Sequence, residues 1–260
     1  MIDGLVSVIM PSWNTSNFIA ESIQSVIDQT YENWELIIVD DCSTDNTDEV
    51  VAEFTDKRIR YFKNEKNSGA ALSRNRALRE SRGEWIAFLD SDDLWNPEKL
   101  EHQIGFMNKY GYTLSYTEYE KIDEESKPLQ IYVSGPEKVN KRKMYNYDYI
   151  GQLTMMYSAK KFGLIQIKDI KKNNDYAIRL QLYKKSDTCA YLLKENLAKY
   201  RVRKVSISHD KFRRKFKSHY DLFHMCDEKP AVVAAWYTCW NMFYGVLKKK
   251  MFECNYKKEF

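Results

Sequence analysis

Short apolar runs alternate with amphipathic stretches over the first 110 residues of the chain. The runs are rich in β-branched residues and predict buried strands over residues 5–10, 34–40, 58–64 and 84–90. The stretches between and after them predict helices, the first capped by Ser16 or Asn17 and the last starting at Pro97. Strand and helix in this order indicate an α/β fold, with a mixed, mostly parallel sheet flanked by helices.

The alternation is weaker beyond residue 110. Strands are predicted over residues 113–122 and 152–158, and the charged residues 123–150, which include two prolines, are expected to form an irregular loop over the sheet edge. Residues 188–202 predict a strand, a turn and a second strand. An amphipathic helix is expected to follow Asp175.

The C-terminal part of the chain is basic. Residues 194–260 hold 16 Lys/Arg against 7 Asp/Glu, whereas residues 1–193 hold 25 against 30. A predicted helix over 231–247 is aromatic and is followed by three lysines. Such a helix suits an anionic membrane surface, which residues 211–250 are expected to bind. The alternatives are packing on the rest of the chain or on a second copy in a homodimer, and a nucleic-acid partner is not expected.

Nothing in the sequence predicts export or a membrane span. No basic segment precedes an apolar run at the N-terminus, and the five cysteines form no CxxC pair. No apolar run reaches the length of about 18 residues that a span needs. We expect a cytoplasmic protein that can associate peripherally with the inner face of the cell membrane.

Acidic residues gather where two of the predicted strands end. Asp40 and Asp41 close the second strand, and residues 90–93 read Asp-Ser-Asp-Asp after the fourth. The carboxyl ends of strands in such sheets are where ligands bind. A helix cap needs one carboxylate, so three within four positions indicate a site. A divalent cation, Mn²⁺ or Mg²⁺, would neutralise them and in turn bind phosphate.

Four motifs, in this order and spacing, resemble the family 2 glycosyltransferases, which have the Rossmann-like GT-A fold. The motifs read VSVIMPSWN, ELIIVDDCSTDNT, NSGAALSRNRAL and GEWIAFLDSDDLWNPEKL. The resemblance continues more weakly through NNDYAIRLQL and ENLAKYRVRKVSIS. It implies a GT-A domain over residues 1–208, with a nucleotide-sugar-binding half (1–110) and an acceptor-binding half (111–208). Residues 209–260 are then a basic, aromatic helical extension.

The resemblance implies a nucleotide-sugar donor, usually a UDP-sugar, and transfer with inversion at the anomeric carbon. Asp41 matches the aspartate that binds the uracil edge. Pro11, Ser12 and Trp13 match the residues that line the uracil pocket, although Trp13 replaces a more usual tyrosine. Arg74 is expected to face the diphosphate or the base, and the alternative for it is a surface position on a helix.

The resemblance also implies roles for the residues of the acidic cluster. Asp90 and Asp92 match the two aspartates of the DxD motif, so that Asp92 is expected to coordinate the metal and Asp90 to contact the ribose or the donor sugar. Asp93 is expected to support them. Asp175 matches the catalytic base, which removes the proton of the acceptor hydroxyl; the alternative is that it only caps a helix. Arg203 stands where the family often has a histidine, and it is expected to face the leaving diphosphate.

We therefore expect an inverting, metal-dependent glycosyltransferase that moves a sugar from a UDP-sugar to a hydroxyl of a glycan or lipid-linked acceptor, in bacterial surface polysaccharide biosynthesis. A nucleotidyltransferase is one alternative, but it would usually need a glycine-rich basic loop after the first strand, and PSWNTSNF is not one. A non-catalytic sugar-nucleotide-binding module is another, and it would tolerate the loss of Asp92 or Asp175.

Overall fold

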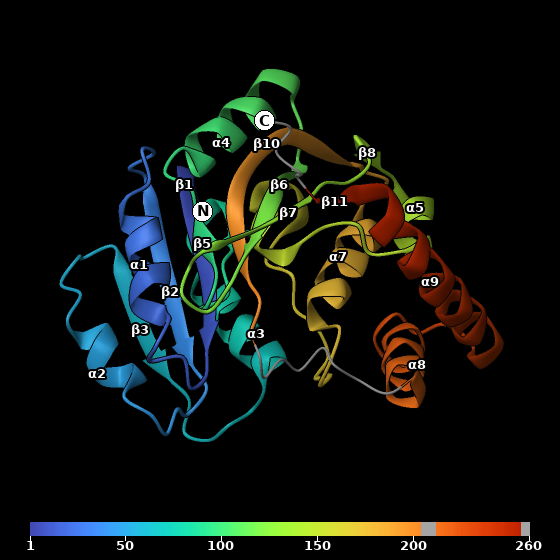
Figure 1. Cartoon of the computed structure of the whole chain (residues 1–260), viewed down its shortest axis with the longest axis horizontal. Helices are drawn as coiled ribbons and strands as arrows, with labels where there is room; N and C mark the ends of the chain where they lie inside the picture. Colours follow the sequence, from blue (N-terminus) through green and yellow to red (C-terminus); the bar gives the residue numbers. More distant parts are fainter. Residues whose placement is uncertain (204–211, 256–260) are drawn as a thin grey trace.

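The computed structural model describes residues 1–203 and 212–255, without the side chains of 248–250, 254 and 255. Within these residues, one mixed sheet of eleven strands runs through the molecule, and helices pack on both of its faces (Figure 1). The strands are β1 (Ile2–Ser12), β2 (Trp34–Asp40), β3 (Ile59–Lys63), β4 (Gly83–Phe88), β5 (Leu94–Trp95), β6 (Leu114–Ile122), β7 (Pro128–Val133), β8 (Lys138–Val139), β9 (Met156–Ser158), β10 (Ala190–Arg201) and β11 (Glu253–Asn255). The helices are α1 (Ile19–Ile27), α2 (Thr47–Ala52), α3 (Ala70–Glu80), α4 (Lys99–Tyr110), α5 (Lys141–Asn146), α6 (Ala159–Phe162), α7 (Asn174–Lys185), α8 (Phe212–Asp221) and α9 (Ala231–Phe252), with a 3₁₀ turn at Gln152–Thr154 and a π turn at Leu222–Cys226.

The four strands predicted from the apolar runs form the parallel part of the sheet, in the order β3-β2-β1-β4. β1 lies between β2 and β4, and its last residue, Ser12, is opposite Asp40 at the end of β2. The predicted α/β fold is therefore confirmed.

Alternation along β1 divides the core into two layers. Val6, Val8 and Met10 are fully buried on the face that α1, α2 and α4 cover. Ile9 points to the opposite face, where it packs in one cluster with residues of α3 and α7. Successive side chains of a strand point to opposite faces, so a strand covered on both sides must be apolar throughout.

Residues 123–150 are more regular than the predicted loop, so that prediction is wrong. β7 pairs antiparallel with β6, β8 pairs with β10, and α5 follows. Most side chains of β7 are exposed, and the strand consequently lacks the apolar alternation from which a strand can be predicted. β7 also receives β11 as a further strand, which the prediction of a purely helical C-terminal extension did not include.

Residues 188–202 form one strand, β10, and the predicted turn within them is wrong. The register of β10 against β6 shifts between Leu193 and Asn196, near the middle of the strand. Such an irregularity bends a strand without ending it. The strand predicted over 152–158 is shorter than expected, because its first half is the 3₁₀ turn and only β9 is extended.

Helix α1 begins at Ile19 without a side-chain cap, so the prediction that Ser16 or Asn17 caps it is wrong. The carbonyl of Thr15 accepts hydrogen bonds from the amides of Ile19 and of the residue before it, both at 2.9 Å. The amide of Ser16 donates instead to Asp45 (3.0 Å), which ties this segment to the turn before α2. Backbone geometry replaces the side-chain cap.

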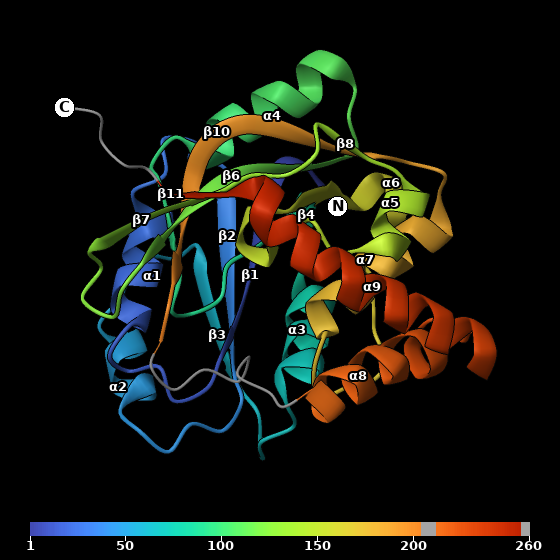
Figure 2. The same ribbon diagram turned by 45° about the vertical axis from the view of Figure 1, so that its right-hand side comes forward.

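Helices α8 and α9 lie side by side at one end of the molecule (Figures 1 and 2). On the face of α9 that packs on the protein, Ala234, Thr238 and Asn241 are buried and Tyr237 packs against the core. The Asn241 amide donates to the hydroxyl of Tyr176 on α7 (2.8 Å), so the extension is bonded to the helix that follows Asn173. The predicted boundary between residues 208 and 209 lies outside the described residues.

Candidate functional site

The carboxyl ends of β1, β2 and β4 lie next to one another at one edge of the sheet. The residues that the sequence singled out are at these ends: 11–13 at the end of β1, Asp41 after β2, and 90–93 after β4. The amide of Asp41 donates to the carbonyl of Ser12 (2.8 Å), which joins the first two segments directly. Segments far apart in the sequence thus form one corner.

Asp41 is buried and holds the turn that leads into α3. Its carboxylate accepts hydrogen bonds from the amides of Ser68 (2.9 Å) and Gly69 (2.6 Å), and Gly69 has a positive φ of 88° that suits glycine. The Asn67 amide, oriented to satisfy both neighbours, donates to Asp41 (3.2 Å) and accepts from the Trp13 indole (2.9 Å). Trp13 is 50% exposed, so its ring can still receive a planar ligand. A contact of Asp41 with uracil remains a prediction.

A chain of hydroxyl groups fixes the acidic segment to β1. Ser12 and Thr15 share a hydrogen bond of 2.9 Å, and the Thr15 hydroxyl donates to that of Ser91 (3.1 Å). Asp93 is buried and accepts from the amide of Arg201 (2.9 Å) at the end of β10. Asp93 thus supports the segment, in keeping with its expected role.

Asp90 and Asp92 each face an arginine. Arg74 donates to Asp90 (2.5 Å), and Arg203 donates to Asp92 (3.3 Å). Burial and the negative charge of Asp90 raise the pKa of Asp92, and the charge of Arg203 opposes this only in part. The carboxylates of Asp90 and Asp92 therefore repel one another in this corner.

Arg74 joins the two halves of the site. Its side chain is 7% exposed, which excludes the alternative of a surface helix arginine. One of its terminal nitrogens donates to Asp90 and the other to the side chain of Asn174, the first residue of α7. No described residue accepts from its buried Nε. A single arginine therefore holds the acidic corner against the start of the helix that carries Asp175.

Asp175 lies in the first turn of α7 with its side chain 41% exposed. Its carboxylate accepts a hydrogen bond from Arg179 (3.1 Å), one helical turn later. Burial alone would raise the pKa of Asp175, but the charges of Arg179 and Arg74 outweigh burial and lower it. The carboxylate is ionised at neutral pH, as a proton acceptor must be. Asn173 holds the cap position before α7, so Asp175 lies one residue inside the helix, and its role as the base stays a prediction.

Arg179 was not predicted from the sequence, although it orients Asp175. Its side chain is 1% exposed and binds Asp148 through Nε (2.7 Å) and a terminal nitrogen, and Gln152 through the other (2.5 Å). The spacing of four residues from Asp175 on a helix is the signal that could have found Arg179. Asp148 lies in the region predicted to be irregular, and no sequence pattern around it indicates a functional residue.

Arg201 was missed as well. It is buried at the end of β10, and its Nε donates to the carbonyl of Asp92 (2.7 Å). A terminal nitrogen donates to Glu21 of α1 (2.8 Å). The backbone of Asp92 is therefore held from a strand more than a hundred residues later.

A divalent cation fits the donor atoms of this corner. Among the described residues, no three His, Cys, Asp or Glu side chains form a ready ligand cluster. Asp90 and Asp92 nevertheless bring two mutually repelling carboxylates together, and hard oxygen atoms of this kind are what Mn²⁺ and Mg²⁺ prefer. Such ions commonly take their remaining ligands from water and from substrate phosphates.

Comparison with known proteins decides the family. The model of Glycosyl transferase family 2 matches residues 7–195. The chain belongs to glycosyl transferase family 2. The putative teichuronic acid biosynthesis glycosyltransferase TuaG of Bacillus subtilis is 41% identical over 80% of this chain and 83% of its own. The Escherichia coli protein WfgD, a UDP-Glc:α-D-GlcNAc-diphosphoundecaprenol β-1,3-glucosyltransferase, is 39% identical over 88% of this chain and 89% of its own.

Two solved structures have folds similar to that of this glycosyltransferase. Staphylococcus aureus TarS (residues 1–349), in complex with UDP-GlcNAc, has a TM-score of 0.68 at 21% identity, over 90% of this chain and 70% of its own. The mannosyltransferase PcManGT of Pyrobaculum calidifontis, in complex with GDP-Man and Mn²⁺, has a TM-score of 0.61 at 15% identity, over 94% of this chain and 74% of its own. The predicted GT-A fold and enzyme class are confirmed, and the nucleotidyltransferase and non-catalytic alternatives are wrong.

Proposed function

We propose that this glycosyltransferase moves a sugar from a UDP-sugar to a hydroxyl of a lipid-linked or glycan acceptor, with inversion, in bacterial surface polysaccharide biosynthesis. The observation that carries the proposal is the position of Arg74, which binds Asp90 of the donor corner and Asn174 beside the proposed base. In this proposal, the residues that bind the donor and the residues that act on the acceptor are therefore joined by one buried side chain. TuaG and WfgD, named for such pathways and acceptors, support the choice of substrates.

Asp175 acts as the general base in this proposal. Its lowered pKa keeps it ionised, so it can accept the proton of the acceptor hydroxyl as the oxygen attacks the anomeric carbon. The bond from that carbon to the diphosphate oxygen breaks in the same step, and UDP leaves with the electron pair. Attack opposite to the leaving group inverts the anomeric configuration.

The donor is held by the corner at the strand ends. Asp41 and Trp13 take the uracil, with Pro11 and Ser12 lining the same pocket, and Asp90 takes the ribose or the donor sugar. Mn²⁺ or Mg²⁺ on Asp92, when bound, stabilises the negative charge that develops on the diphosphate. Arg203, which lies 3.3 Å from Asp92, is placed to add a second positive charge.

Release of UDP from a panel of UDP-sugars tests the proposal. We expect one sugar to be turned over with Mn²⁺ and a GlcNAc-diphosphate lipid or glycan acceptor, and turnover to stop when EDTA removes the metal. The product of an α-linked donor should carry a β-linkage. Absence of turnover with every sugar nucleotide and acceptor would overturn the proposal.

We extend the proposal to the membrane surface. α9 exposes large apolar side chains, which are Val232, Val233, Trp236, Phe243, Val246 and Met251. The neighbouring α8 exposes Phe212 and the basic side chains of its sequence FRRKFK. Among the described helices, none combines the length and the apolar character that crossing a bilayer requires. An apolar face beside basic residues suits binding to an anionic surface of a bilayer.

Vesicle binding should therefore depend on the exposed face of α9. We expect the full chain to sediment with vesicles that contain phosphatidylglycerol, and Trp236→Glu or Phe243→Glu to weaken this by at least about tenfold. Tyr110→Glu changes a ring that is 53% exposed on α4 and should have no effect. Equal sedimentation of all variants would contradict the membrane assignment. Point substitutions are preferable to deletion of the extension, because deletion also removes β11 from the sheet.

A further inference from the structure

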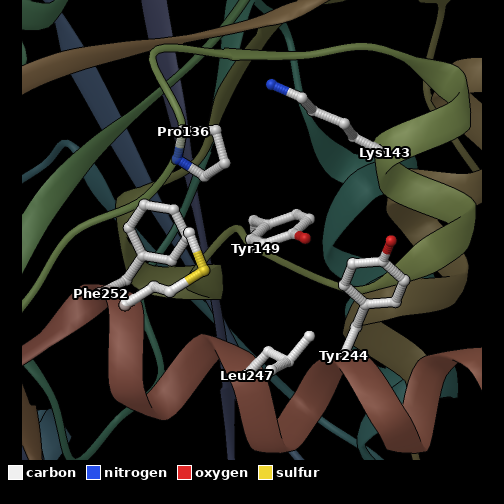
Figure 3. A pocket seen from close by; sticks show the side chains of 7 residues that line it. Pro136, Lys143, Tyr149, Tyr244, Leu247 and Phe252 are labelled. Carbon is white, nitrogen blue, oxygen red and sulfur yellow. The ribbon is translucent and has the colours of Figure 1, made fainter.

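A cavity of about 220 Å³ lies between α9 and the segment that includes α5 (Figure 3). Its lining residues are Pro136, Lys143, Tyr149, Tyr244, Leu247, Met251 and Phe252. Figure 3 shows the ring of Tyr149 in the middle, between Pro136 and Leu247 of α9. Of the lining residues only Lys143 is charged, and its ammonium group already donates to the carbonyl of Lys138 (3.1 Å). The cavity therefore suits an apolar group.

The cavity is continuous with the exposed face of α9. Met251 lines it and is 67% exposed, and Val246 and Phe243, which precede it on the helix, are 65% and 56% exposed. An apolar chain that enters from this face passes from one apolar surface to another.

The cavity also adjoins the residues that orient the proposed base. Tyr149 follows Asp148, whose carboxylate binds Arg179, and Arg179 binds Asp175. Asp148 and Tyr149 are thus neighbours in sequence. Asp148 belongs to the ion pairs that hold Asp175, and Tyr149 lines the cavity.

We propose that this cavity binds part of the isoprenoid chain of a lipid-linked acceptor. The inference rests on the proposed function, which brings the acceptor hydroxyl to Asp175. A free glycan would need several hydrogen-bonding groups, and the lining offers two phenol hydroxyls and one engaged ammonium. The volume is below the roughly 300–1,000 Å³ of sites that enclose a whole ligand. One segment of the chain therefore enters, and the remainder stays along α9.

Binding of farnesyl phosphate to the full chain tests this assignment. It carries an isoprenoid chain and one phosphate, and its dissociation constant is measurable by equilibrium dialysis without any donor. We expect Leu247→Gln and Met251→Gln each to raise the dissociation constant about tenfold, because the amide loses its water when the chain enters. Met251 is already exposed, so its replacement should leave folding unchanged. Leu129→Gln makes the same change on β7, at a residue 39% exposed and outside the cavity, and should have no effect.

Two results would overturn the assignment. One is equal binding, or no saturable binding, by the wild type and all three variants. The other is displacement of farnesyl phosphate by an equal concentration of inorganic phosphate, which would show that the phosphate and not the chain is recognised. The assay also separates this inference from the proposed function. If farnesyl phosphate binding is weakened by Leu247→Gln and Met251→Gln but no UDP-sugar is turned over, the cavity assignment holds and the proposed function does not. If UDP-sugar is turned over with equal KM for long-chain and short-chain acceptors, the proposed function holds and the cavity assignment does not.

Discussion

Asp175→Asn should reduce sugar transfer by about 10²- to 10⁴-fold while UDP binding stays unchanged. Asparagine can still accept the hydrogen bond from Arg179, and Arg179 keeps its two bonds to Asp148, so the site should fold normally. What is lost is the group that takes the proton. Turnover of the UDP-sugar identified in the donor panel, together with titration of UDP binding, measures the two effects separately.

Asp187→Asn provides the matched control, since this aspartate is exposed beyond the end of α7 and should transfer sugar at the wild-type rate. The pH profile adds a second readout. Because the pKa of Asp175 is lowered, protonation of this group should reduce the rate only as pH falls below the usual carboxyl range near about 4. Normal transfer by Asp175→Asn would assign the base to another residue.

Asp92→Ala should abolish metal-dependent UDP binding, lowering the affinity in Mn²⁺ by about 100-fold, or about 2.7 kcal/mol. The free energy of unfolding should not fall. Burial and the charge of Asp90 raise the pKa of Asp92 above its unfolded value, so ionised Asp92 destabilises the folded state relative to the unfolded state at neutral pH. Removing it relieves repulsion within the corner. Calorimetric titration with UDP and thermal unfolding measure the two quantities.

Asp3→Ala is the control, since the Asp3 side chain is 86% exposed and pairs with Lys160 outside the corner. It should bind UDP as the wild type does. Retention of Mn²⁺-dependent UDP binding by Asp92→Ala would move the metal to other residues. A fall in the unfolding temperature of Asp92→Ala would instead indicate a structural role for this carboxylate.

The sequence locates the acidic corner at the strand ends because this corner depends on short local patterns. Asp41, Asp90 and Asp92 each follow an apolar run, and parallel strands bring their ends together whatever the loops do. β7 shows the opposite case, since its exposed side chains carry no periodic signal and only its pairing with β6 and β11 defines it.

The contacts that join the two halves of the site could not be read from the sequence. Arg74 and Asn174 are a hundred residues apart, and only the packing of α3 near α7 brings them together. Arg179 and Asp148 are a similar case, because the partner lies in a region without a recognisable pattern. The exposed face of α9 was predicted in part: Trp236 and Phe243 are exposed as a membrane face requires, but Tyr244 and Leu247 line the cavity.

We propose that Asp92 holds the metal and the donor, while Asp175 performs proton transfer. Measuring Mn²⁺-dependent UDP binding and sugar transfer side by side for the wild type, Asp92→Ala and Asp175→Asn tests it most directly. We expect Asp92→Ala to lose both UDP binding and sugar transfer. We expect Asp175→Asn to lose sugar transfer and to keep UDP binding. Loss of UDP binding in Asp175→Asn, or normal transfer by either variant, would contradict it.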